Sequence, residues 1–519
     1  MIKKLRVELL PEVAFQKELR AAFFKKHLAI ENEPWWEKPI KQSIDARGKR
    51  VKVILETEIH VNESYLKDTT LHFKPKDLET SVPVYIIGAG PAGLFAALRA
   101  IELGMKPVII ERGKDVRERR RDLAAITKNH DVNPESNYCF GEGGAGTYSD
   151  GKLYTRSKKR GSVQRILHLL NEHGAPDQIL YEAHPHIGTN KLPKVVQAIR
   201  EAIIAAGGEI RFNTKLTNFE LSGNRISALY LNGEKNEIKG DVILATGHSA
   251  RDIYELLNAK KVKIEPKPFA LGIRIEHPQT LIDHIQYHGD KSAFLPAAAY
   301  ALVHQTHVKQ VQRGVFSFCM CPGGFIVPAA TSNGEVVVNG MSPSKRNSKY
   351  ANSGIVVASE IEDFKAFEKH GALAGMHYQA QFEQKACAIA GNNQTAPAQR
   401  MVDFINGKVS DSLNDCSYVP GLASVDLQEV LGAEISARLR QAFTEFGQKM
   451  KGYLTNEANI VGVESRSSAP VRIPRDKQTL QHLEIENLYP CAEGAGYAGG
   501  IVSAAIDGML CAEAVCAKA

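Results

Sequence analysis

Three glycine-rich stretches carry the strongest chemical signal in this sequence. The first, YIIGAGPAGLFAALRA, starts at Tyr85 and has the spacing G-x-G-x-x-G at Gly88, Gly90 and Gly93. An apolar run precedes these glycines and an alanine-rich run follows them, which predicts a strand, a tight turn and a helix. In such a turn the second glycine lets the backbone approach a pyrophosphate, and the helix N-terminus offers free amides to the phosphates. This stretch therefore predicts a dinucleotide site.

An acidic residue stands where that site needs one. The next apolar run, KPVIIERG, ends at Glu111, about 20 residues beyond the turn, where an acid binds the ribose hydroxyls of the adenosine half. Arg112 follows directly, within reach of a cofactor phosphate. At this end we expect the dinucleotide to contact Gly88, Gly90, Pro91, Ala92, Gly93, Glu111 and Arg112.

The second stretch, CAEGAGYAGGIVSAAIDG, starts at Cys491 and repeats the spacing at Gly494, Gly496 and Gly499. No second strand and no acid follow it to complete a βαβ unit. We therefore expect no independent NAD site there, and interpret the stretch as the other side of one shared nucleotide site.

The motifs require elements that bring them together. A chain of 519 residues is too long to fold around a single hydrophobic core, so several domains are expected. The βαβ unit after residue 83 precedes helical stretches and then short strands with Ser-Gly-Asn and Asn-Gly-Glu turns, which predict a β-meander. We predict an α/β fold with a Rossmann-like domain in two parts, 76–263 and 471–519. An inserted α+β substrate or cap domain would occupy 264–470, and a small N-terminal α+β module 1–75.

Two local patterns add further expectations. The Glu, Pro and Trp cluster ENEPWWEKP at 31–39 indicates a loop, and IVVASEIEDFKAF at 355–367 indicates a helix.

Several longer stretches resemble one known family. They are CFGEGGAGTYSDGKL, ATGHSARD, FSFCMCPGGFIVPAA, VVNGMSPSKRN, ESRSSAPVRIPRD and CAEGAGYAGGIVSAA. From about Pro83 onward the chain resembles bacterial FAD-dependent, or NAD(FAD)-utilising, dehydrogenases, flavoproteins of the glutathione-reductase class. The resemblance implies that the Rossmann-like domain is an FAD-binding domain and the cofactor is FAD.

The resemblance also implies further FAD contacts. In that class an Ala-Thr-Gly run closes the meander beside FAD, an acid near the C-terminus reaches the ribityl chain or phosphates, and the next helix points its N-terminus at the flavin. The matching residues are Ala245, Thr246, Gly247, Glu493, Gly494, Gly499, Gly500 and Ile501. The third glycine stretch, from Phe140 to Lys152, is either a close backbone contact to the flavin or pyrophosphate or a flexible surface loop. On the first interpretation its contacts are Gly143, Gly144, Ala145 and Gly146.

Cys319 and Cys321 in CMCPGG are the first candidates for redox chemistry. Strand alternation would point both thiols to one face, which alone makes no disulfide. Buried structural cysteines are the alternative interpretation.

His248, directly after the Ala-Thr-Gly run, is a candidate proton donor or substrate ligand, or a histidine satisfied by a backbone carbonyl. Arg466 and Arg472 could bind a substrate carboxylate or pair with Glu464 or Asp476. Arg400 is a further candidate of the same kind.

Composition limits the function classes. The net charge of +7 is modest for this length and does not require nucleic acid. The first residues carry scattered charges where a signal peptide needs an apolar run, and no apolar stretch is suited to a membrane span. None of the spacings of the eight cysteines suggests a metal site. We expect a cytoplasmic protein with reduced thiols, a small-molecule substrate and neither a membrane nor a nucleic-acid partner.

These observations favour an FAD-dependent oxidoreductase that exchanges a hydride between flavin and a small organic substrate. No second complete Rossmann unit is present for NAD(P)H, so a reduced nicotinamide would visit the flavin transiently or another donor would serve. Two alternatives stay open: an RNA-directed flavoenzyme that uses the basic RGKRVK hairpin of the N-terminal module as an adaptor, and a non-catalytic flavin-bound sensor.

Overall fold

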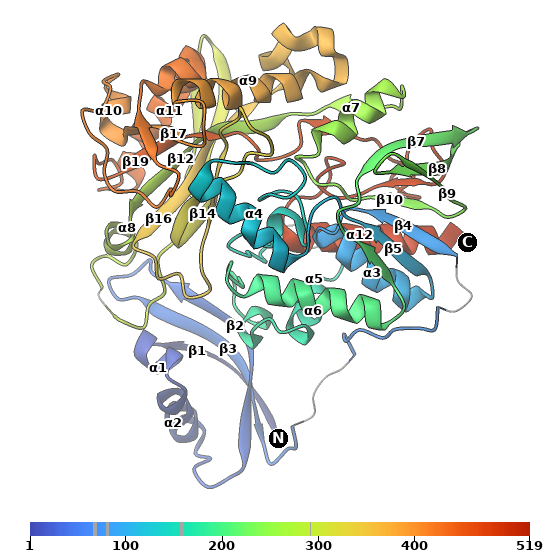
Figure 1. The fold of residues 1–519 in the computed structure, drawn as a ribbon. Coiled ribbons are helices and arrows are strands. Elements are labelled where there is room, and N and C mark those ends of the chain that lie inside the picture. Colours follow the sequence, from blue (N-terminus) through green and yellow to red (C-terminus); the bar gives the residue numbers. More distant parts are fainter. Residues whose placement is uncertain (66–69, 79–81, 156–159, 291, 519) are drawn as a thin grey trace.

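The computed structural model describes residues 1–65, 70–78, 82–155, 160–290 and 292–518. The N-terminal module stands at one end of the molecule and the two larger β-sheets lie side by side above it (Figure 1). The protein is a mixed α/β structure with a parallel sheet.

The N-terminal module is a three-stranded antiparallel sheet with helices on one face. Its elements are β1 (Ile2–Leu9), α1 (Pro11–Phe15), α2 (Lys17–Leu28), β2 (Trp35–Asp45) and β3 (Lys52–Val61), and the strand order is β1-β3-β2. The expectation of a loop over 31–39 was wrong from Trp35 onward. Trp36 pairs with His60 across β2 and β3, and their rings stack with centroids 3.8 Å apart. Such cross-strand aromatic pairs stabilise a sheet, and the local Pro and Glu residues do not reveal them.

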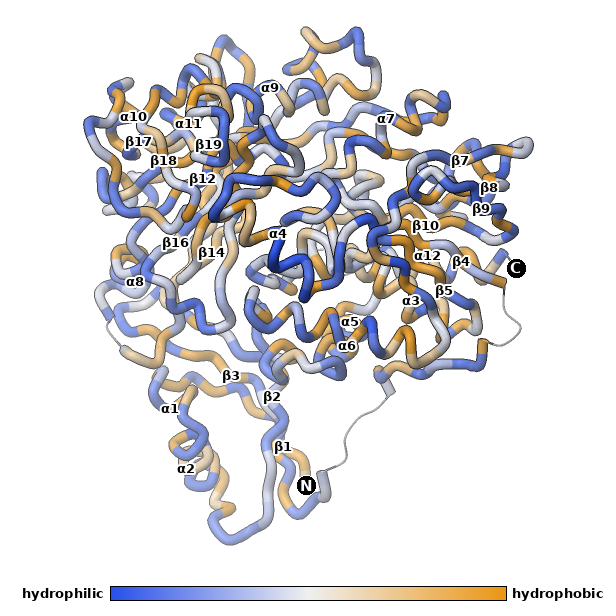
Figure 2. The backbone as a smooth tube through the Cα atoms, viewed as in Figure 1, coloured by the Kyte–Doolittle hydropathy of each residue, from blue (hydrophilic) through white to orange (hydrophobic). Residues whose placement is uncertain are grey.

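A five-stranded parallel sheet, order β21-β10-β4-β5-β6, joins the two ends of the FAD-related sequence. Its strands are β4 (Pro83–Ile87), β5 (Lys106–Ile110), β6 (Glu209–Arg211), β10 (Val242–Leu244) and β21 (Leu488–Pro490). The helices near it are α3 (Pro91–Leu103), α4 (Val116–Asn129), α5 (Val163–Glu172), α6 (Leu192–Ala205) and α12 (Ile501–Lys518). Figure 2 shows α3 as mainly hydrophobic and α4 as mainly hydrophilic, in keeping with their burial.

Helices α3 and α12 pack against each other unusually closely. A Cβ atom at Gly508 would lie only 2.1 Å from the Ala92 carbonyl oxygen, so the contact requires glycine. This contact fixes the N-termini of α3 and α12 relative to each other.

Between β6 and β10, the strands β7 (Leu216–Ser222), β8 (Arg225–Leu231) and β9 (Glu234–Glu237) form an antiparallel meander. Helix α7 (Arg251–Ala259) follows β10. The meander carries the chain from one side of the parallel sheet to its central strands.

The other large sheet has eight strands, in the order β13-β14-β16-β12-β19-β17-β18 with β15 paired to β14. Its strands are β12 (Phe269–Pro278), β13 (Val303–Val308), β14 (Val311–Pro328), β15 (Val338–Met341), β16 (Tyr350–Ser359), β17 (Ala396–Arg400), β18 (Leu422–Ser424) and β19 (Asn459–Glu464). The helices in this region are α8 (Gln279–Gln286), the 3-10 segment η3 (Ile361–Leu373), α9 (Ala374–Ile389), α10 (Met401–Ile405) and α11 (Leu427–Lys449). Strands β11 (Glu265–Pro266) and β20 (Val471–Arg472) pair beside it.

The expectation of a helix over 355–367 was wrong in its first half. Ile355, Val356 and Val357 belong to β16, which pairs with β12 on one side and β14 on the other. These side chains are buried, and β-branched residues suit a central strand better than a helix. Sheet pairing with distant strands therefore overrides the local helical period.

Candidate functional site

The first glycine turn lies between β4 and α3, and its three glycines have different surroundings. A Cβ at Gly88 would lie 2.4 Å from the Ala245 carbonyl oxygen, and one at Gly93 would lie 1.9 Å from that of Gly88. Gly90 differs, because a Cβ there would meet no atom within 4 Å. Among the described residues, the amides of Gly90, Ala92 and Gly93 have no hydrogen-bond acceptor. The turn thus presents open space and free N–H groups at a helix N-terminus, which suits a phosphate.

Glu111 holds the neighbouring loops together. Its carboxylate accepts hydrogen bonds from the amides of Ala89 (2.8 Å), Gly113 (2.9 Å) and Gly141 (3.0 Å). A carboxylate has about four lone-pair positions, so capacity for a ribose hydroxyl remains. In this structure Glu111 therefore also joins the third glycine stretch to the first.

Arg112 has protein partners in place of the phosphate expected from the sequence. Its guanidinium forms ion pairs with Asp252 and with Glu135, the latter at 2.9 Å, and lies over the ring of Phe140. These contacts tie the end of β5 to α7 and to the third glycine stretch.

The third glycine stretch lies against the other two. A Cβ at Gly144 would be 3.3 Å from Gly90 Cα, and one at Gly146 would be 3.3 Å from Pro91 Cγ and 3.5 Å from Ile501 Cγ1. The stretch therefore lies at the N-termini of both α3 and α12. Gly143 is held there by its amide, which donates to the Ala89 carbonyl at 2.8 Å.

The C-terminal stretch packs onto the Ala-Thr-Gly run. A Cβ at Gly494 would lie 2.7 Å from the Gly247 carbonyl oxygen, whereas the space beside Gly247 itself is open. Ala245 continues the sheet by donating to the Ile87 carbonyl at 2.9 Å. The hydroxyl of Thr246 is buried and has no hydrogen-bond partner among the described residues. A buried orphan donor beside an open glycine is typical of a site that a ligand completes.

Glu493 lies beside the exposed Gly499 and Gly500, just before α12. Burial raises the pKa of its carboxyl to about 7, and Lys267 only partly opposes this shift. No hydrogen bond to its carboxylate is found among the described residues. Glu493 is therefore available to accept hydrogen bonds from ribityl hydroxyls.

These residues fit an elongated anionic dinucleotide. Open space occurs at Gly90 and Gly247, unused amides occur at the starts of α3 and α12, and Thr246 and Glu493 are available as polar side chains. These features come from three segments that are far apart in the sequence, near residues 90, 246 and 500.

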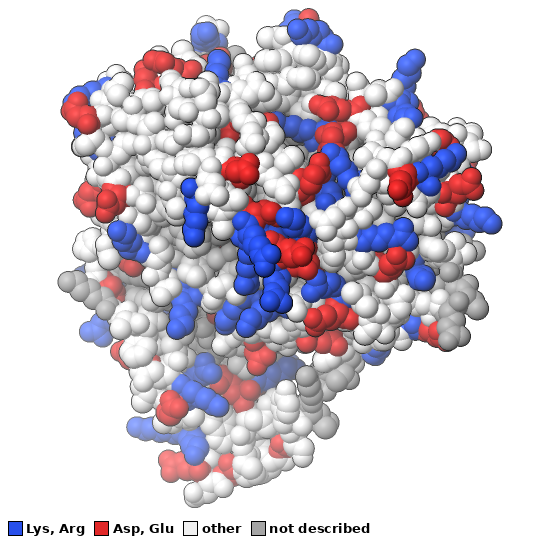
Figure 3. Space-filling model, viewed as in Figure 1, with Lys and Arg blue, Asp and Glu red and all other residues white. Residues whose placement is uncertain are grey.

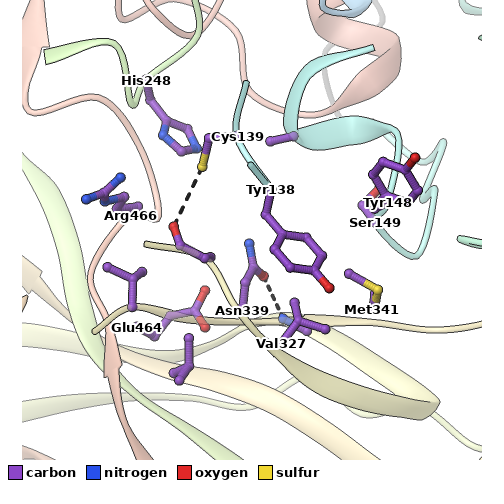
Figure 4. A pocket seen from close by; sticks show the side chains of 15 residues that line it. Tyr138, Cys139, Tyr148, Ser149, His248, Val327, Asn339, Met341, Glu464 and Arg466 are labelled. Carbon is purple, nitrogen blue, oxygen red and sulfur yellow. Dashed lines mark hydrogen bonds between the residues drawn. The ribbon is translucent and has the colours of Figure 1, made fainter. Parts of the chain in front are cut away.

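A pocket adjoins the third glycine stretch at Ala145. In Figure 4, His248 and Arg466 lie on one side of it, Tyr148, Ser149 and Met341 on the other, with Tyr138 and Asn339 between them. It is lined by Tyr138, Cys139, Ala145, Tyr148, Ser149, His248, Val327, Ala329, Val337, Val338, Asn339, Gly340, Met341, Glu464 and Arg466. Its walls thus come from the third glycine stretch and the residues just before it, from the residue after the Ala-Thr-Gly run, and from the eight-stranded sheet with its adjoining loops.

His248 is the candidate proton-transfer group that does line the pocket. Its Nδ1 lies 2.8 Å from Ser249 Oγ. Burial, followed by the positive charges of Arg466 and Arg251, lowers the pKa of His248 to about 4. At neutral pH the ring is therefore uncharged and can accept one proton at a ring nitrogen.

Arg466 lines the pocket but its guanidinium is engaged. It bonds both oxygens of Glu383 (3.0 and 2.9 Å), Glu335 at 2.7 Å and the Thr331 hydroxyl at 2.6 Å. The partners considered from the sequence, Glu464 and Asp476, are not those found. Four of its five N–H groups are thus engaged by the protein, and Arg466 is mainly a buried structural cation.

The other candidates lie elsewhere. Arg472 is exposed, with its guanidinium over the Tyr497 ring at 5.9 Å. Arg400 bonds Asp403 at 2.8 Å. Neither residue lines the pocket.

Cys319 and Cys321 do not show the regular alternation expected of a strand. Cys319 has a left-handed φ of 45°, and the β14–β16 register shifts between Phe318 and Cys321. The extra residue is a β-bulge, and both sulfurs lie close to Lys152.

One group among the described residues has the spacing of a metal site: Cys491, Asp507 and Cys511, whose ligand atoms lie within 4.8 Å of one another. Arg475 already donates to both Asp507 oxygens, at 2.9 and 2.6 Å, and lies 3.6 Å from Cys511 Sγ. A cation from the chain itself thus fills this cluster. Separately, none of the helices in the described ranges has the length and apolar character needed to cross a bilayer.

Comparison with known proteins identifies the family of this chain. Residues 268–467 match the model of an FAD-dependent protein, C-terminal domain-like, and residues 1–60 match a domain of unknown function. An uncharacterized protein of Clostridium beijerinckii is 40% identical over 498 residues, which is 92% of each chain. The chain belongs to a family of FAD-dependent flavoproteins.

Solved structures similar to this FAD-dependent flavoprotein share little sequence with it. Glycine oxidase from Bacillus cereus is 13% identical with a TM-score of 0.32, over 85% of this chain and 96% of that one. L-amino acid deaminase from Proteus vulgaris is 10% identical with a TM-score of 0.37, over 87% and 96%.

Several site residues of this FAD-dependent flavoprotein were missed from the sequence, namely Tyr138, Tyr148, Ser149, Asn339 and Lys152. They are ordinary polar residues in loops and strand ends, and no local pattern distinguishes them. Arg274 did carry a signal, since it stands between two isoleucines in an apolar strand. It is buried and paired with Glu464 at 2.7 Å, as a charge in such a strand must be.

Proposed function

We propose that this protein is an FAD-dependent oxidoreductase that exchanges a hydride with a small organic substrate bound in the pocket beside Ala145. The observation that carries the proposal is the convergence of three distant glycine stretches at the N-termini of α3 and α12, next to that pocket. When bound, FAD supplies a two-electron hydride acceptor and donor.

The chain's own groups would hold and polarise the cofactor. The unbonded amides and positive dipole end of α3 bind phosphate, and those of α12 stabilise negative charge at the ring end. Glu493 accepts hydrogen bonds from hydroxyls of the linking chain, for which it must be ionised or present its carbonyl oxygen.

His248 is proposed as a substrate ligand whose neutral ring accepts a hydrogen bond. Its ring is neutral above about pH 4, and Ser249 fixes its orientation through Nδ1. Tyr138 stays protonated and can donate a hydrogen bond into the pocket, because burial raises its pKa to about 12. The pair offers one acceptor and one donor on a largely apolar surface.

The electron donor or acceptor that completes the cycle is proposed to be NAD(P)H, visiting the flavin without a dedicated Rossmann domain. The test is an anaerobic stopped-flow mix of the purified protein with NADPH and, separately, NADH, following the visible flavin band. Rapid bleaching with either one supports the nicotinamide-dependent reaction. A flavin that stays oxidised with both refutes nicotinamide as the donor.

The part of His248 in hydride exchange is tested with His248→Phe, which keeps an aromatic ring but removes the hydrogen-bond acceptor. Flavin content should be unchanged, whereas flavin reduction by a substrate found in a screen of amines, alcohols and hydroxy acids should slow by about tenfold, the effect of one lost hydrogen bond. Equal reduction rates in the two proteins would remove His248 from the mechanism.

A further inference from the structure

Lys152 and two cysteines form a charged thiol cluster outside the pocket. Lys152 Nζ lies 3.8 Å from Cys319 Sγ and 3.5 Å from Cys321 Sγ. The Lys152 side chain is 37% exposed and Cys319 is half-buried, so the cluster lies near the protein surface. Asp150 holds the ammonium in place at 3.3 Å and is itself bonded by Arg346 at 2.7 Å.

The two thiols differ in their hydrogen bonding. The Cys321 thiol lies 3.2 Å from the Cys319 carbonyl oxygen, to which it can donate, and it is fully buried. The neighbouring Cys321 thiol lowers the pKa of Cys319 well below its usual value, and the positive charges of Lys152 and Arg274 act in the same direction against burial. The proximity of Cys319, together with burial, raises the pKa of Cys321. Of the two thiols, Cys319 is thus the one that ionises more readily.

The backbone brings these thiols together. Residues two apart on a regular strand span about 6.6 Å, near the upper limit for a disulfide. The left-handed Cys319 and the β-bulge depart from that regular geometry, and both sulfurs lie within 3.8 Å of the same Lys152 nitrogen. The pair therefore lies in an irregular segment that is not bound to the spacing of a regular strand.

We propose that Cys319 and Cys321 are a redox-active dithiol that reduces small disulfides by thiol–disulfide exchange. The Cys319 thiolate attacks one sulfur of a disulfide RS–SR, the S–S bond breaks, and RS⁻ leaves as the Cys319 mixed disulfide forms. Cys321 then attacks Cys319 Sγ and gives up its proton, and the second RS⁻ leaves. The products are the Cys319–Cys321 disulfide, one RSH and one RS⁻, so the substrate gains two electrons and the dithiol loses two.

A second cysteine pair in the chain serves as a matched control. Cys491 and Cys511 also lie in contact, but both are fully buried. The neighbouring Cys511 thiol, burial and the negative charge of Asp507 raise the pKa of Cys491, in that order of importance. Arg475 opposes this shift only in part, and its guanidinium donates hydrogen bonds to Asp507. This pair is close enough to interact but lacks an exposed nucleophile, so we expect it to stay reduced.

The first experiment measures alkylation of each cysteine in the native flavin-loaded protein by iodoacetamide at pH 7, with peptide mass spectrometry. Cys319 should react at least about tenfold faster than Cys491 or Cys511. Repeated over a range of pH values, the assay should show the rise in Cys319 alkylation shifted upward by about one pH unit in Lys152→Met and preserved in Lys152→Arg. If Cys319 reacts no faster than the control pair, or if a folded Lys152→Met keeps the wild-type pH profile, the activated thiolate is refuted.

The second experiment adds glutathione disulfide and locates the products on unreduced peptides. The wild-type protein should form the Cys319–Cys321 disulfide, Cys321→Ser should retain glutathione on Cys319, and Cys319→Ser should form neither. Flavin absorbance and circular dichroism establish that each variant is folded. Absence of the disulfide in the wild type, or equal oxidation of Cys491 and Cys511, overturns the proposal whether or not the flavin reaction is found.

Discussion

Replacing Gly90 with valine should separate cofactor binding from folding. Gly90 has φ −73° and ψ −177°, an extended conformation that valine adopts readily, and its Cβ would meet no protein atom within 4 Å. As the N-cap of α3, valine costs roughly 0.5–1 kcal/mol relative to glycine. The flavin-free protein should therefore fold almost as well as the wild type.

The substitution should mainly weaken the binding of FAD. The side chain would occupy the open space in front of the free amides of Ala92 and Gly93, where we place the pyrophosphate. Loss of two hydrogen bonds to a charged group, at about 1.5–3 kcal/mol each, amounts to about 3–6 kcal/mol, or a 10²–10⁴-fold weaker Kd. Gly90→Ala should give a smaller loss.

The assay measures the flavin-to-protein absorbance ratio of the purified variants, FAD titration of the flavin-free proteins by calorimetry, and thermal unfolding. Gly48→Val is the control, because Gly48 lies in the N-terminal module and a Cβ there would be 3.8 Å from its nearest neighbour, the Arg50 carbonyl oxygen. A Gly90→Val protein that retains stoichiometric FAD would show that this turn does not hold the pyrophosphate.

Three further substitutions probe the groups around the site. The pKa of the Glu493 carboxyl is raised to about 7, so in the flavin-free protein this group takes up a proton on folding at any pH between its ordinary pKa and about 7. The free energy of unfolding should therefore fall as the pH rises through this window. Thermal unfolding at a series of pH values should show this fall in the wild type and not in Glu493→Gln. Arg466→Met leaves the buried carboxylate of Glu383 short of a partner and should cost roughly 3–5 kcal/mol in urea unfolding, and a cost under about 1 kcal/mol would contradict the assigned network. Gly508→Ala must push α12 away from Ala92, so it should cost about 1–3 kcal/mol and also weaken FAD binding in calorimetry; unchanged affinity would mean that the spacing of the two helix ends is unimportant.

The sequence predicted the parts of the fold that depend on local backbone geometry. The strand, turn and helix around Gly88 and Gly93 follow from contacts in which a Cβ has no room, and such constraints are visible as glycine spacing. The strand at Trp36 and the strand at Ile355 were missed because their stability comes from pairing with distant strands, which no local period reveals.

The same distinction applies to the site. Stretches with fixed glycine spacing could be assigned to a nucleotide, but the partners of individual side chains could not. Arg466 bonds Glu383, which is 83 residues away in the sequence, and Arg112 meets Asp252 across 140 residues. The choice between a substrate-binding arginine and a structural one depends on such contacts, so residue type and spacing left it open.

The resulting charge distribution argues for an uncharged group in the pocket. Its two charged lining residues are both compensated within the protein, Arg466 by Glu383 and Glu335, and Glu464 by Arg274. A substrate carboxylate would have to compete with these buried ion pairs, and removing one partner from such a pair is costly. The available positive potential lies instead at the N-termini of α3 and α12, where free amides face the proposed cofactor. We therefore expect neutral substrates to reduce the flavin at a higher rate than their carboxylate analogues. A higher rate with the carboxylates would instead require Arg466 to exchange its protein partners for the substrate.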